Sequence, residues 1–404
     1  MTAATQPQPK DWSELPEDLV VMINERNSAL ARTRHHHPVP SRPHQYFPFL
    51  FLPYEDDKDN RDNHLNGLPS KEFRRMYCPG SSHGWLVVVE ENTSSMYLIN
   101  PFTRAQLPLP PMSKVRILVG KEKVHCNFEL GNPSYSRVRK VVLSSSPSSS
   151  SSNVVAIAIY GGFSEIGFSK PGDKAWTRFG DFPVMDVLFY RNHIYAVRKS
   201  CSREIDIEIL VYHMGADITA AGGGGGGPVP KLVDIIKPPE GYQTRWRPYL
   251  VVSCGDLLII ERDVLTLLND KQFDVKTVGF RVFKLCRLRN SSDDNNKTSS
   301  STAWEQIKNL GDRMLFLGVN SSLSLSSHDF PPGSCRGNCI YFTHRHDCVN
   351  IKQGWGYDDM AKFDMGIFNL EDKHIEPFPL ESSFTGNSLT RLCPPPIWLT
   401  PSTI

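Results

Sequence analysis

The sequence predicts a mainly β protein, a single β-propeller of about six or seven blades preceded by a short N-terminal helix. Short runs of β-branched and aromatic residues recur from residue 73 to residue 380, separated by Gly, Pro, Asn and Ser turns. No long helical pattern alternates with these runs, which disfavours a parallel α/β sheet. A four-stranded unit of roughly 45 residues cannot bury both of its faces alone, and radial stacking of such units in a propeller covers them.

The N-terminal region carries the clearest helix signal in the chain. Residues 1–10 are a polar leader that we expect to be disordered, and residues 11–31 form an amphipathic segment. Ser13 is a suitable N-cap, and Pro16 fits the first turn of the helix that follows. The apolar side chains that share one face of this helix are Leu15, Leu19, Val20 and Ile23.

The helical pattern fails after Ala31. Residues 32–48, RTRHHHPVPSRPHQYFP, carry four prolines and four histidines, and the charged stretch EDDKDNRDNH follows. A helix does not tolerate this density of proline. We therefore expect an irregular linker over residues 32–72, the propeller domain over residues 73–380, and a C-terminal tail over residues 381–404 that packs on the propeller.

Hairpins and loops are predicted within the propeller domain. Arg191-Asn192 separates two apolar runs in FYRNHIYAV, and Cys254-Gly255-Asp256 does so in YLVVSCGDLLII. Low-complexity segments rich in Ser, Gly or Asn interrupt the strand pattern and are expected to be loops, at residues 144–152, 220–230 and 290–302. The large side chains that we expect to anchor the packing between blades are Trp85, Trp176 and Trp304.

Composition excludes several classes of function. The 404 residues include 45 Lys and Arg against 43 Asp and Glu, so the balance of charge does not indicate a nucleic-acid binder. No run approaches the ~18–20 apolar residues of a membrane helix, and the N-terminal residues lack the apolar core of a secretory signal. An odd number of cysteines, 9, then predicts reduced thiols in a cytoplasmic or nuclear protein.

Two patterns that are typical of enzymes have simpler interpretations. Gly80-Ser81-Ser82-His83-Gly84 fits the G-x-S-x-G nucleophile elbow, which requires a strand followed by a helix. The residues that follow, WLVVV, predict a strand, so we interpret the motif as a turn that enters a strand. Gly222–Gly227 contains G-x-G-x-x-G, but Pro228 blocks a following helix, so a flexible linker is the better interpretation.

A group of cysteines and histidines near the C-terminus has some features of a metal site. Its members are Cys335, Cys339, His344, His346 and Cys348. The first two have a C-x₃-C spacing that zinc sites use. However, CIYFT predicts a strand in which Cys339 and His344 point to opposite faces. We favour a core strand leading into a His-rich loop, with zinc as the alternative, and expect no catalytic residues and no cofactor.

Several motifs resemble a known family. DWSELPEDLVVMI is similar to the start of an F-box, and the stretches that follow resemble, in order, the C-terminal β-propeller domain of a large plant F-box family. These stretches include GSSHGWLVVV, YLINPFTRAQLPLPP, KPGDKAWTRF, MDVLFYRNHIYAV, YLVVSCGDLLIIER and FDMGIFNLEDKHIEPF. The F-box departs from the family pattern because the His- and Pro-rich residues 32–48 replace its second and third helices, so it is truncated.

The resemblance implies a function in protein recruitment. An F-box-like helix would bind the Skp-type linker of a cullin–RING ubiquitin ligase through Leu15, Pro16, Leu19, Val20 and Ile23, and the propeller would hold an unknown substrate protein. Because the F-box is truncated, we expect linker binding to be weak or lost. The chain would then be a non-catalytic adaptor that binds neither nucleic acid nor membrane. The alternative is a propeller interaction module with a decayed F-box and no role in a ligase.

Overall fold

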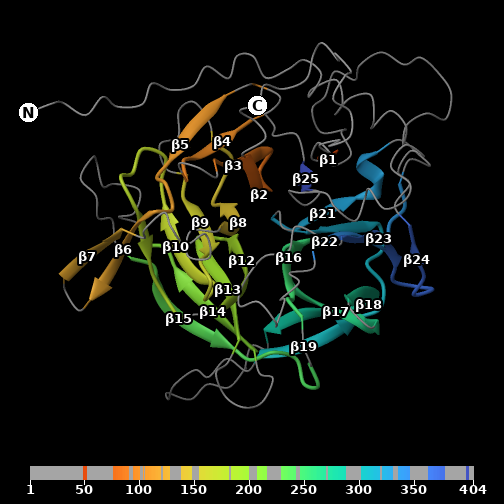
Figure 1. Ribbon diagram of the computed structural model, residues 1–404. Coiled ribbons are helices and arrows are strands. Elements are labelled where there is room, and N and C mark those ends of the chain that lie inside the picture. The colour runs from red at the N-terminus through yellow and green to blue at the C-terminus, as the bar shows by residue number, and fades with distance from the viewer. Residues whose placement is uncertain are drawn as a thin grey trace, which may run out of the picture.

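In the computed structural model, the described residues form a β structure built from 25 numbered strands (Figure 1). The described residues are 49–51, 76–90, 94–100, 103, 105–119, 122–127, 138–147, 154–181, 183–199, 207–215, 229–242, 246–269, 272–287, 302–318, 321–330, 335–345, 363–377 and 397–399. Within them, the one helical element is the 3₁₀ turn η5 (Ser327–Asp329), and no helix is long and apolar enough to cross a membrane.

Five sheets form the blades, numbered here in chain order. Blade 1 contains β2 (Met76–Ser82), β3 (Trp85–Glu90), β4 (Met96–Ile99) and β5 (Gln106–Leu109). Blade 2 contains β8 (Val138–Leu143), β9 (Ala156–Tyr160), β10 (Glu165–Ser169) and β11 (Trp176–Arg178), together with the hairpin of β6 (Lys114–Val119) and β7 (Glu122–Asn127). Blade 3 contains β12 (Val184–Tyr190), β13 (His193–Lys199), β14 (Ile207–His213) and β15 (Lys231–Ile236).

The last two blades are larger or less regular. Blade 4 contains β16 (Tyr249–Ser253), β17 (Asp256–Asn269), β18 (Gln272–Arg287) and β19 (Thr302–Ile307), and its central strands are the longest. Blade 5 contains β20 (Arg313–Leu317), β21 (Leu323–Ser326), β22 (Cys339–Arg345), β23 (Phe363–Asn369) and β24 (Ile375–Glu376). A separate pair joins β1 (Phe49–Phe51) to β25 (Ile397–Leu399).

The prediction of a mainly β propeller is confirmed, but the predicted blade number is wrong. The described residues form 5 blade-sized sheets where the sequence predicted about six or seven. Blades 2 to 5 use more chain than the prediction assumed, and in three of them a low-complexity segment occurs in the sequence between two strands of the same blade. Residues 144–152 come between β8 and β9 in the sequence, residues 220–230 come between β14 and β15, and residues 290–302 lead from β18 to the first residue of β19. Blade 2 also takes in the β6–β7 hairpin through parallel pairing of β11 with β6.

The innermost strands meet around a common centre. Strand β2 contacts β8, β8 contacts β12, β12 contacts β16, and β16 contacts β21 (Figure 1). The ring closes where the backbone N–H of Ser321 donates to the carbonyl of Ser81 over 2.9 Å, and where the Ser81 hydroxyl donates to the carbonyl of Trp398. Blade 5 and β25 therefore complete the circle against blade 1.

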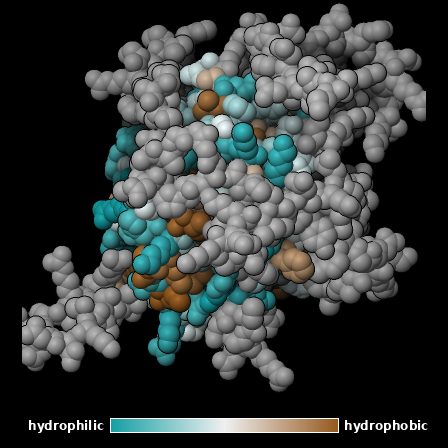
Figure 2. Space-filling view, turned by 90° about the vertical axis from the view of Figure 1, so that its left-hand side faces the viewer, coloured by the Kyte–Doolittle hydropathy of each residue, from teal (hydrophilic) through white to brown (hydrophobic). Residues whose placement is uncertain are grey.

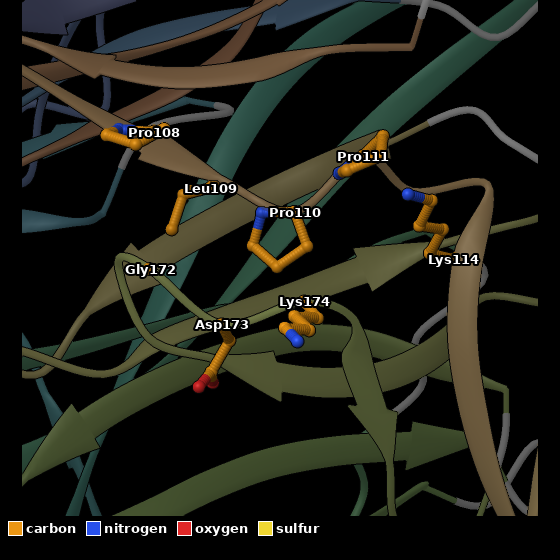
Figure 3. Close-up of a pocket in the computed structure, with 8 residues that line it drawn as sticks. All are labelled: Pro108, Leu109, Pro110, Pro111, Lys114, Gly172, Asp173 and Lys174. Carbon is orange, nitrogen blue, oxygen red and sulfur yellow. The ribbon is translucent and has the colours of Figure 1, made fainter. Parts of the chain in front are cut away.

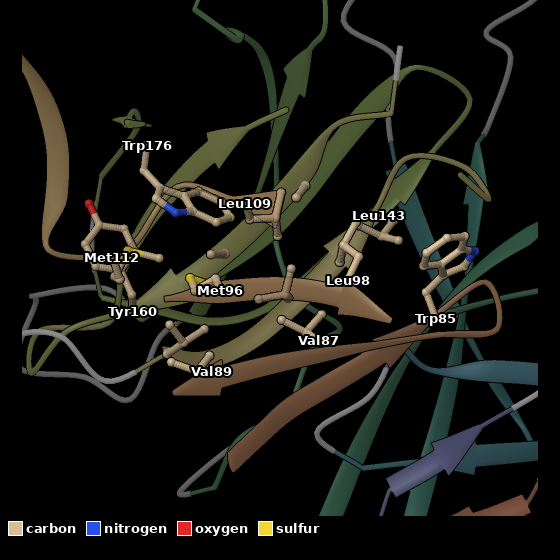
Figure 4. Packing of buried hydrophobic residues seen from close by; sticks show 14 of the residues in the cluster. Trp85, Val87, Val89, Met96, Leu98, Leu109, Met112, Leu143, Tyr160 and Trp176 are labelled. Carbon is tan, nitrogen blue, oxygen red and sulfur yellow. The ribbon is translucent and has the colours of Figure 1, made fainter. Parts of the chain in front are cut away.

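The hydrophobic core fills the spaces between neighbouring sheets rather than one central volume. One cluster joins blades 1 and 2 and contains Trp85, Met96, Leu98 and Trp176 (Figure 4). Similar clusters join blades 2 and 3, blades 3 and 4, and blades 4 and 5. A fifth cluster packs Trp398 of β25 against Phe316 and Tyr341 of blade 5. This distribution explains the continuous apolar runs of strands such as β9, whose five residues are all buried, because both faces of a blade are covered.

Candidate functional site

Hydrogen bonds across the inner strands fix their relative direction. The Lys140 ammonium of β8 pairs with Oδ1 of Asp186 in β12, and Oδ2 of the same carboxylate accepts the N–H of Leu250 in β16 over 2.7 Å. These residues lie in the first half of their strands, and at the far end Tyr190, the last residue of β12, bonds to Gly255, which follows β16, so β12 and β16 run in the same direction. Both ionic side chains are buried, and the pair therefore ties three blades together at the centre of the propeller.

A set of hydroxyl contacts lies near the last residues of β2, β8 and β16, and near the start of β21. Ser82 Oγ accepts the N–H of Leu143 over 3.1 Å, and Ser321 Oγ bonds to it at 3.0 Å. Ser253 Oγ and Ser324 Oγ are 2.7 Å apart and join β16 to β21. Ser82 is the central residue of the G-x-S-x-G pattern, and a strand follows it as predicted, so its hydroxyl holds blades together and is not exposed at a strand-to-helix elbow.

Two-residue turns project from this end of the inner strands. They connect β2 to β3 through His83-Gly84, β12 to β13 through Arg191-Asn192, and β16 to β17 through Cys254-Gly255. Both residues of each turn have positive φ, which is the geometry of the type I′ hairpin. Because β2, β12 and β16 run in the same direction, the three turns lie on one side of the propeller, which we call the turn face.

The turn face holds side chains at backbone positions that glycine or asparagine usually occupy. His83, Arg191 and Cys254 have φ values of 52°, 48° and 52°. A left-handed conformation costs a residue with a Cβ atom roughly 1 kcal/mol. Gly84, Asn192 and Gly255 supply the second position of each turn, where this conformation is easily adopted. The first position of each turn therefore carries a side chain at an energetic cost that Gly or Asn would avoid.

The turn of blade 3 is held rigidly. Asn192 Nδ2 donates to the carbonyl of Met214 over 2.7 Å, and the His193 ring lies 5.0 Å from the His213 ring. The Tyr190 hydroxyl donates to the carbonyl of Gly255 over 3.1 Å, which links this turn to the turn of blade 4. The Arg191 guanidinium lies 4.9 Å from the centre of the Tyr190 ring. These contacts fix a tyrosine and an arginine beside each other at the surface.

Chemically, this pair suits recognition of another protein. Tyrosine and arginine are enriched at the points that dominate the energy of protein interfaces. A guanidinium held over an aromatic ring keeps its charge and loses little freedom when a partner binds. Nearby, Lys284 and Asp256 neutralise each other in an ion pair of 2.6 Å, and the hydrogen bond to Asp256 raises the pKa of Lys284. The Tyr190–Arg191 pair is our candidate for partner binding.

A second polar group lies between blades 4 and 5 and is buried. Arg262 donates from Nε to the Thr277 hydroxyl over 2.6 Å and from Nη2 to Asp364 over 2.9 Å. The Tyr249 hydroxyl and Nδ1 of His344 are 3.0 Å apart, and burial raises the pKa of Tyr249 to about 12. These contacts join β16, β17, β18, β22 and β23, so their evident role is to hold the last two blades together.

A cavity of about 460 Å³ lies on the outside of blades 1 and 2 (Figure 3). Pro108, Pro110 and Pro111 form one wall, and the turn containing Asp173 and Lys174 forms the other. Oδ2 of Asp173 accepts the N–H of Lys170 over 2.9 Å, and Figure 3 shows this carboxylate pointing away from the prolines. The carboxylate is committed to its own turn, so this cavity offers no paired acid and base for catalysis.

The structure places the predicted anchors in the spaces between blades. Trp85 and Trp176 are buried in the cluster between blades 1 and 2, and Trp176 Nε1 donates to the carbonyl of Pro110 over 2.7 Å. Trp304 is partly buried between blades 3 and 4, and its Nε1 donates to the carbonyl of Lys237 over 2.8 Å. The predicted linker-binding residues lie outside the described part of the chain, and their role stays a prediction: Leu15, Pro16, Leu19, Val20 and Ile23.

The predicted metal alternative gains no support from the residues described. Cys339 is buried against Phe316 and Trp398, whereas His344 bonds to Tyr249 of blade 4. The two residues therefore lie on opposite faces of β22, as the strand alternation predicted. His346 and Cys348 lie outside the described residues, and the described part of the chain contains no group of three or more potential metal ligands.

The sequence predicted the turns at Arg191-Asn192 and Cys254-Gly255, but it did not predict that both lie on the turn face. Each turn is readable from a pair of strands with a short polar joint. That they lie on the same side depends on parallel inner strands, which are far apart in the chain. The signal that could have found them is the recurrence of a two-residue turn after the first strand of a blade.

Comparison with known proteins identifies the family to which the propeller domain belongs. The family model of the KIB1-4 beta-propeller matches residues 51–369. The chain is 23% identical to the probable F-box protein At4g22165 of Arabidopsis thaliana, over 91% of this chain and 92% of that protein. It is 23% identical to F-box protein SKIP23 of the same plant, over 96% of both chains. The resemblance to plant F-box proteins with a C-terminal propeller is confirmed.

Proposed function

This chain belongs to the KIB1-4 beta-propeller family, and from this membership we propose that it is a non-catalytic substrate receptor of a cullin–RING ubiquitin ligase. In this proposal the F-box-like segment, residues 11–31, binds a Skp-type linker, and the propeller binds a substrate protein. The receptor accelerates ubiquitin transfer by raising the effective concentration of the substrate near the ubiquitin-loaded enzyme. The names of the relatives, which are F-box proteins, support the first part.

The observation that carries the second part is the Tyr190–Arg191 pair on the turn face. The Tyr190 hydroxyl is bonded to blade 4, and the Arg191 guanidinium lies over the Tyr190 ring, before any partner arrives. A preorganised surface loses less entropy on binding than a mobile one, and its affinity rises accordingly. Truncation of a tyrosine or arginine that dominates a protein interface typically costs about 2 kcal/mol or more. We therefore assign substrate binding to the turn face.

A second candidate function is a propeller interaction module that has no role in a ligase. The His- and Pro-rich residues 32–48 favour it, because they stand where an F-box has its second and third helices. One short helix supplies only part of a standard interface, which buries roughly 800 Å² on each partner. It is also marginally stable alone, so its ordering on binding costs further free energy.

Calorimetric titration of the full chain with a purified Skp-type linker separates these two functions. We expect weak but measurable binding that a Leu15→Ala, Leu19→Ala double variant abolishes. Arg191→Ala is the matched control, because it changes the turn face and should leave linker binding unchanged. No heat of binding from the unaltered chain would favour the module without a ligase role. Binding that survives the double variant would show that another surface recruits the linker.

A further inference from the structure

The outer strand of blade 3 exposes apolar side chains to an unusual degree. Five of the six residues of β15 are exposed, and only Ile236 is buried. Leu232, Val233 and Ile235 are exposed to 41%, 52% and 46%. Figure 2 views the side of the molecule on which β15 lies, and brown side chains gather between teal ones in the lower half of this face. A strand that only closed the blade would carry polar residues on its solvent side.

One edge of β15 is unpaired within the described residues, because its ladder partner is β14 alone. The N–H of Ile235 donates over 2.8 Å to the side chain of Asp234, its own neighbour. An edge amide that a local carboxylate satisfies is protected against accidental pairing. The carboxylate is nevertheless exposed, so an incoming carbonyl can take its place and release it. At the end of the edge, the carbonyl of Lys237 is already bonded to Trp304.

The order of charges along this edge selects the partner. Residues 231–237 read KLVDIIK, with a lysine at each end and Asp234 in the middle. Antiparallel pairing with a second copy, centred on Asp234, would place aspartate opposite aspartate and lysine opposite lysine. Like charges directly opposite each other destabilise a strand pair, whereas opposite charges stabilise it. In the register that pairs the whole of residues 231–237, a second copy of this chain is therefore a poor fit.

We propose that the β15 edge binds an extended segment of a partner protein that has a basic residue at its centre, apolar residues on both sides of it, and acidic residues at its ends. The partner adds a strand to blade 3, and its main chain pairs with the free edge. Its basic residue attracts Asp234 away from the Ile235 amide, and a partner carbonyl accepts that amide instead. Leu232, Val233 and Ile235 pack against its apolar side chains. This surface is distinct from the turn face and from the F-box-like segment.

Fluorescence anisotropy with two synthetic peptides tests the proposal on the full chain. The peptide EVIKVVE has the complementary order of charges, and KVIEVVK has the reverse order; each carries a soluble polyethylene glycol tail and a fluorophore. We expect the chain to bind the first at least about ten-fold more tightly, since three charge pairs change sign between the peptides. The triple variant Lys231→Glu, Asp234→Lys, Lys237→Glu should invert this preference.

Lys174→Glu is the matched control variant, because it alters an exposed residue of blade 2 and changes the net charge by the same amount. It should keep the preference of the unaltered chain. Equal binding of both peptides, binding of neither, or an unchanged preference in the triple variant would overturn the proposal. Sedimentation that shows a dimer, which Val233→Glu converts to a monomer, would replace it with pairing between two copies. The titration uses no linker protein, so its outcome is independent of ligase assembly.

Discussion

The Lys140–Asp186 ion pair offers the sharpest test of how the blades hold together. The exposed fractions of the two side chains are 8% and 4%, and the Asp186 carboxylate also accepts the N–H of Leu250. Asp186→Ala removes the carboxylate and leaves a buried ammonium and a buried backbone N–H without partners. Removal of one member of a buried ion pair typically costs about 3–5 kcal/mol. We expect a decrease in the free energy of unfolding within that range.

A control variant separates this decrease in the free energy of unfolding from a general effect of removing an aspartate. Asp181 pairs with Arg198, but its side chain is 67% exposed, and an exposed pair contributes about 0–1 kcal/mol. Asp181→Ala is therefore the matched control. A further variant, Lys140→Met with Asp186→Asn, removes both charges and keeps an oxygen that can accept the N–H of Leu250. We expect it to be more stable than Asp186→Ala, because no unpaired charge stays buried.

Urea unfolding followed by tryptophan fluorescence measures these differences. Asp186→Ala should unfold at a clearly lower urea concentration than Asp181→Ala, with the double variant between Asp186→Ala and the unaltered chain. If Asp186→Ala and Asp181→Ala were equally stable, the pair would be solvated in solution, and its assignment as the tie between three blades would be wrong.

Three further predictions follow from single side chains. Trp176→Phe should lower the free energy of unfolding by about 1–3 kcal/mol, because it removes the hydrogen bond to Pro110 and leaves a void. Trp304→Phe should lower it less, because Trp304 is only partly buried. Urea unfolding of the two variants measures the difference. Burial raises the pKa of Tyr249 to about 12, so the folded chain holds a proton that the unfolded chain loses near pH 10. The stability of the fold should therefore decrease as the pH rises from 10 to 12. Melting curves should show a smaller decrease for Tyr249→Phe. Cys254→Asn should raise stability by about 0.5–1 kcal/mol, because asparagine adopts the positive φ of that turn more easily, and a decrease would show that the cysteine makes a contact worth more than its strain.

Local features of the fold were predictable from the sequence, and long-range ones were not. The hairpins at Arg191-Asn192 and Cys254-Gly255 follow from turn residues between apolar runs, and both occur where expected. The blade number failed because it depends on which strands share a sheet. The parallel pairings of β11 with β6 and of β20 with β22 join segments without a hairpin between them. No turn residues mark such pairings in the sequence. Dividing the length of the domain by a typical blade length therefore predicted too many blades.

The candidate site could not be predicted from the sequence for the same reason. Tyr190 is an unremarkable end of an apolar strand until its hydroxyl is seen to reach Gly255 of the next blade. Between these two residues the chain forms the remaining strands of blade 3 and the inner strand of blade 4, so their proximity arises only from the packing of neighbouring inner strands. The Arg191 position, by contrast, is marked in the sequence by a short polar joint between two apolar runs. The structure adds that a residue with a Cβ atom there has a backbone conformation that glycine or asparagine adopts at lower cost.

Closure of the ring also depends on residues at opposite ends of the chain. Strand β25 pairs with β1, and Trp398 donates from Nε1 to the carbonyl of Leu317 over 3.1 Å while its own carbonyl accepts the Ser81 hydroxyl. Trp398 therefore contacts the first and the last blade at once. A propeller that is sealed in this way completes its last interface only when the C-terminal strand arrives. The closing contacts thus link the two ends of the chain to the packing of blades 1 and 5, which no repeat within the blades could reveal.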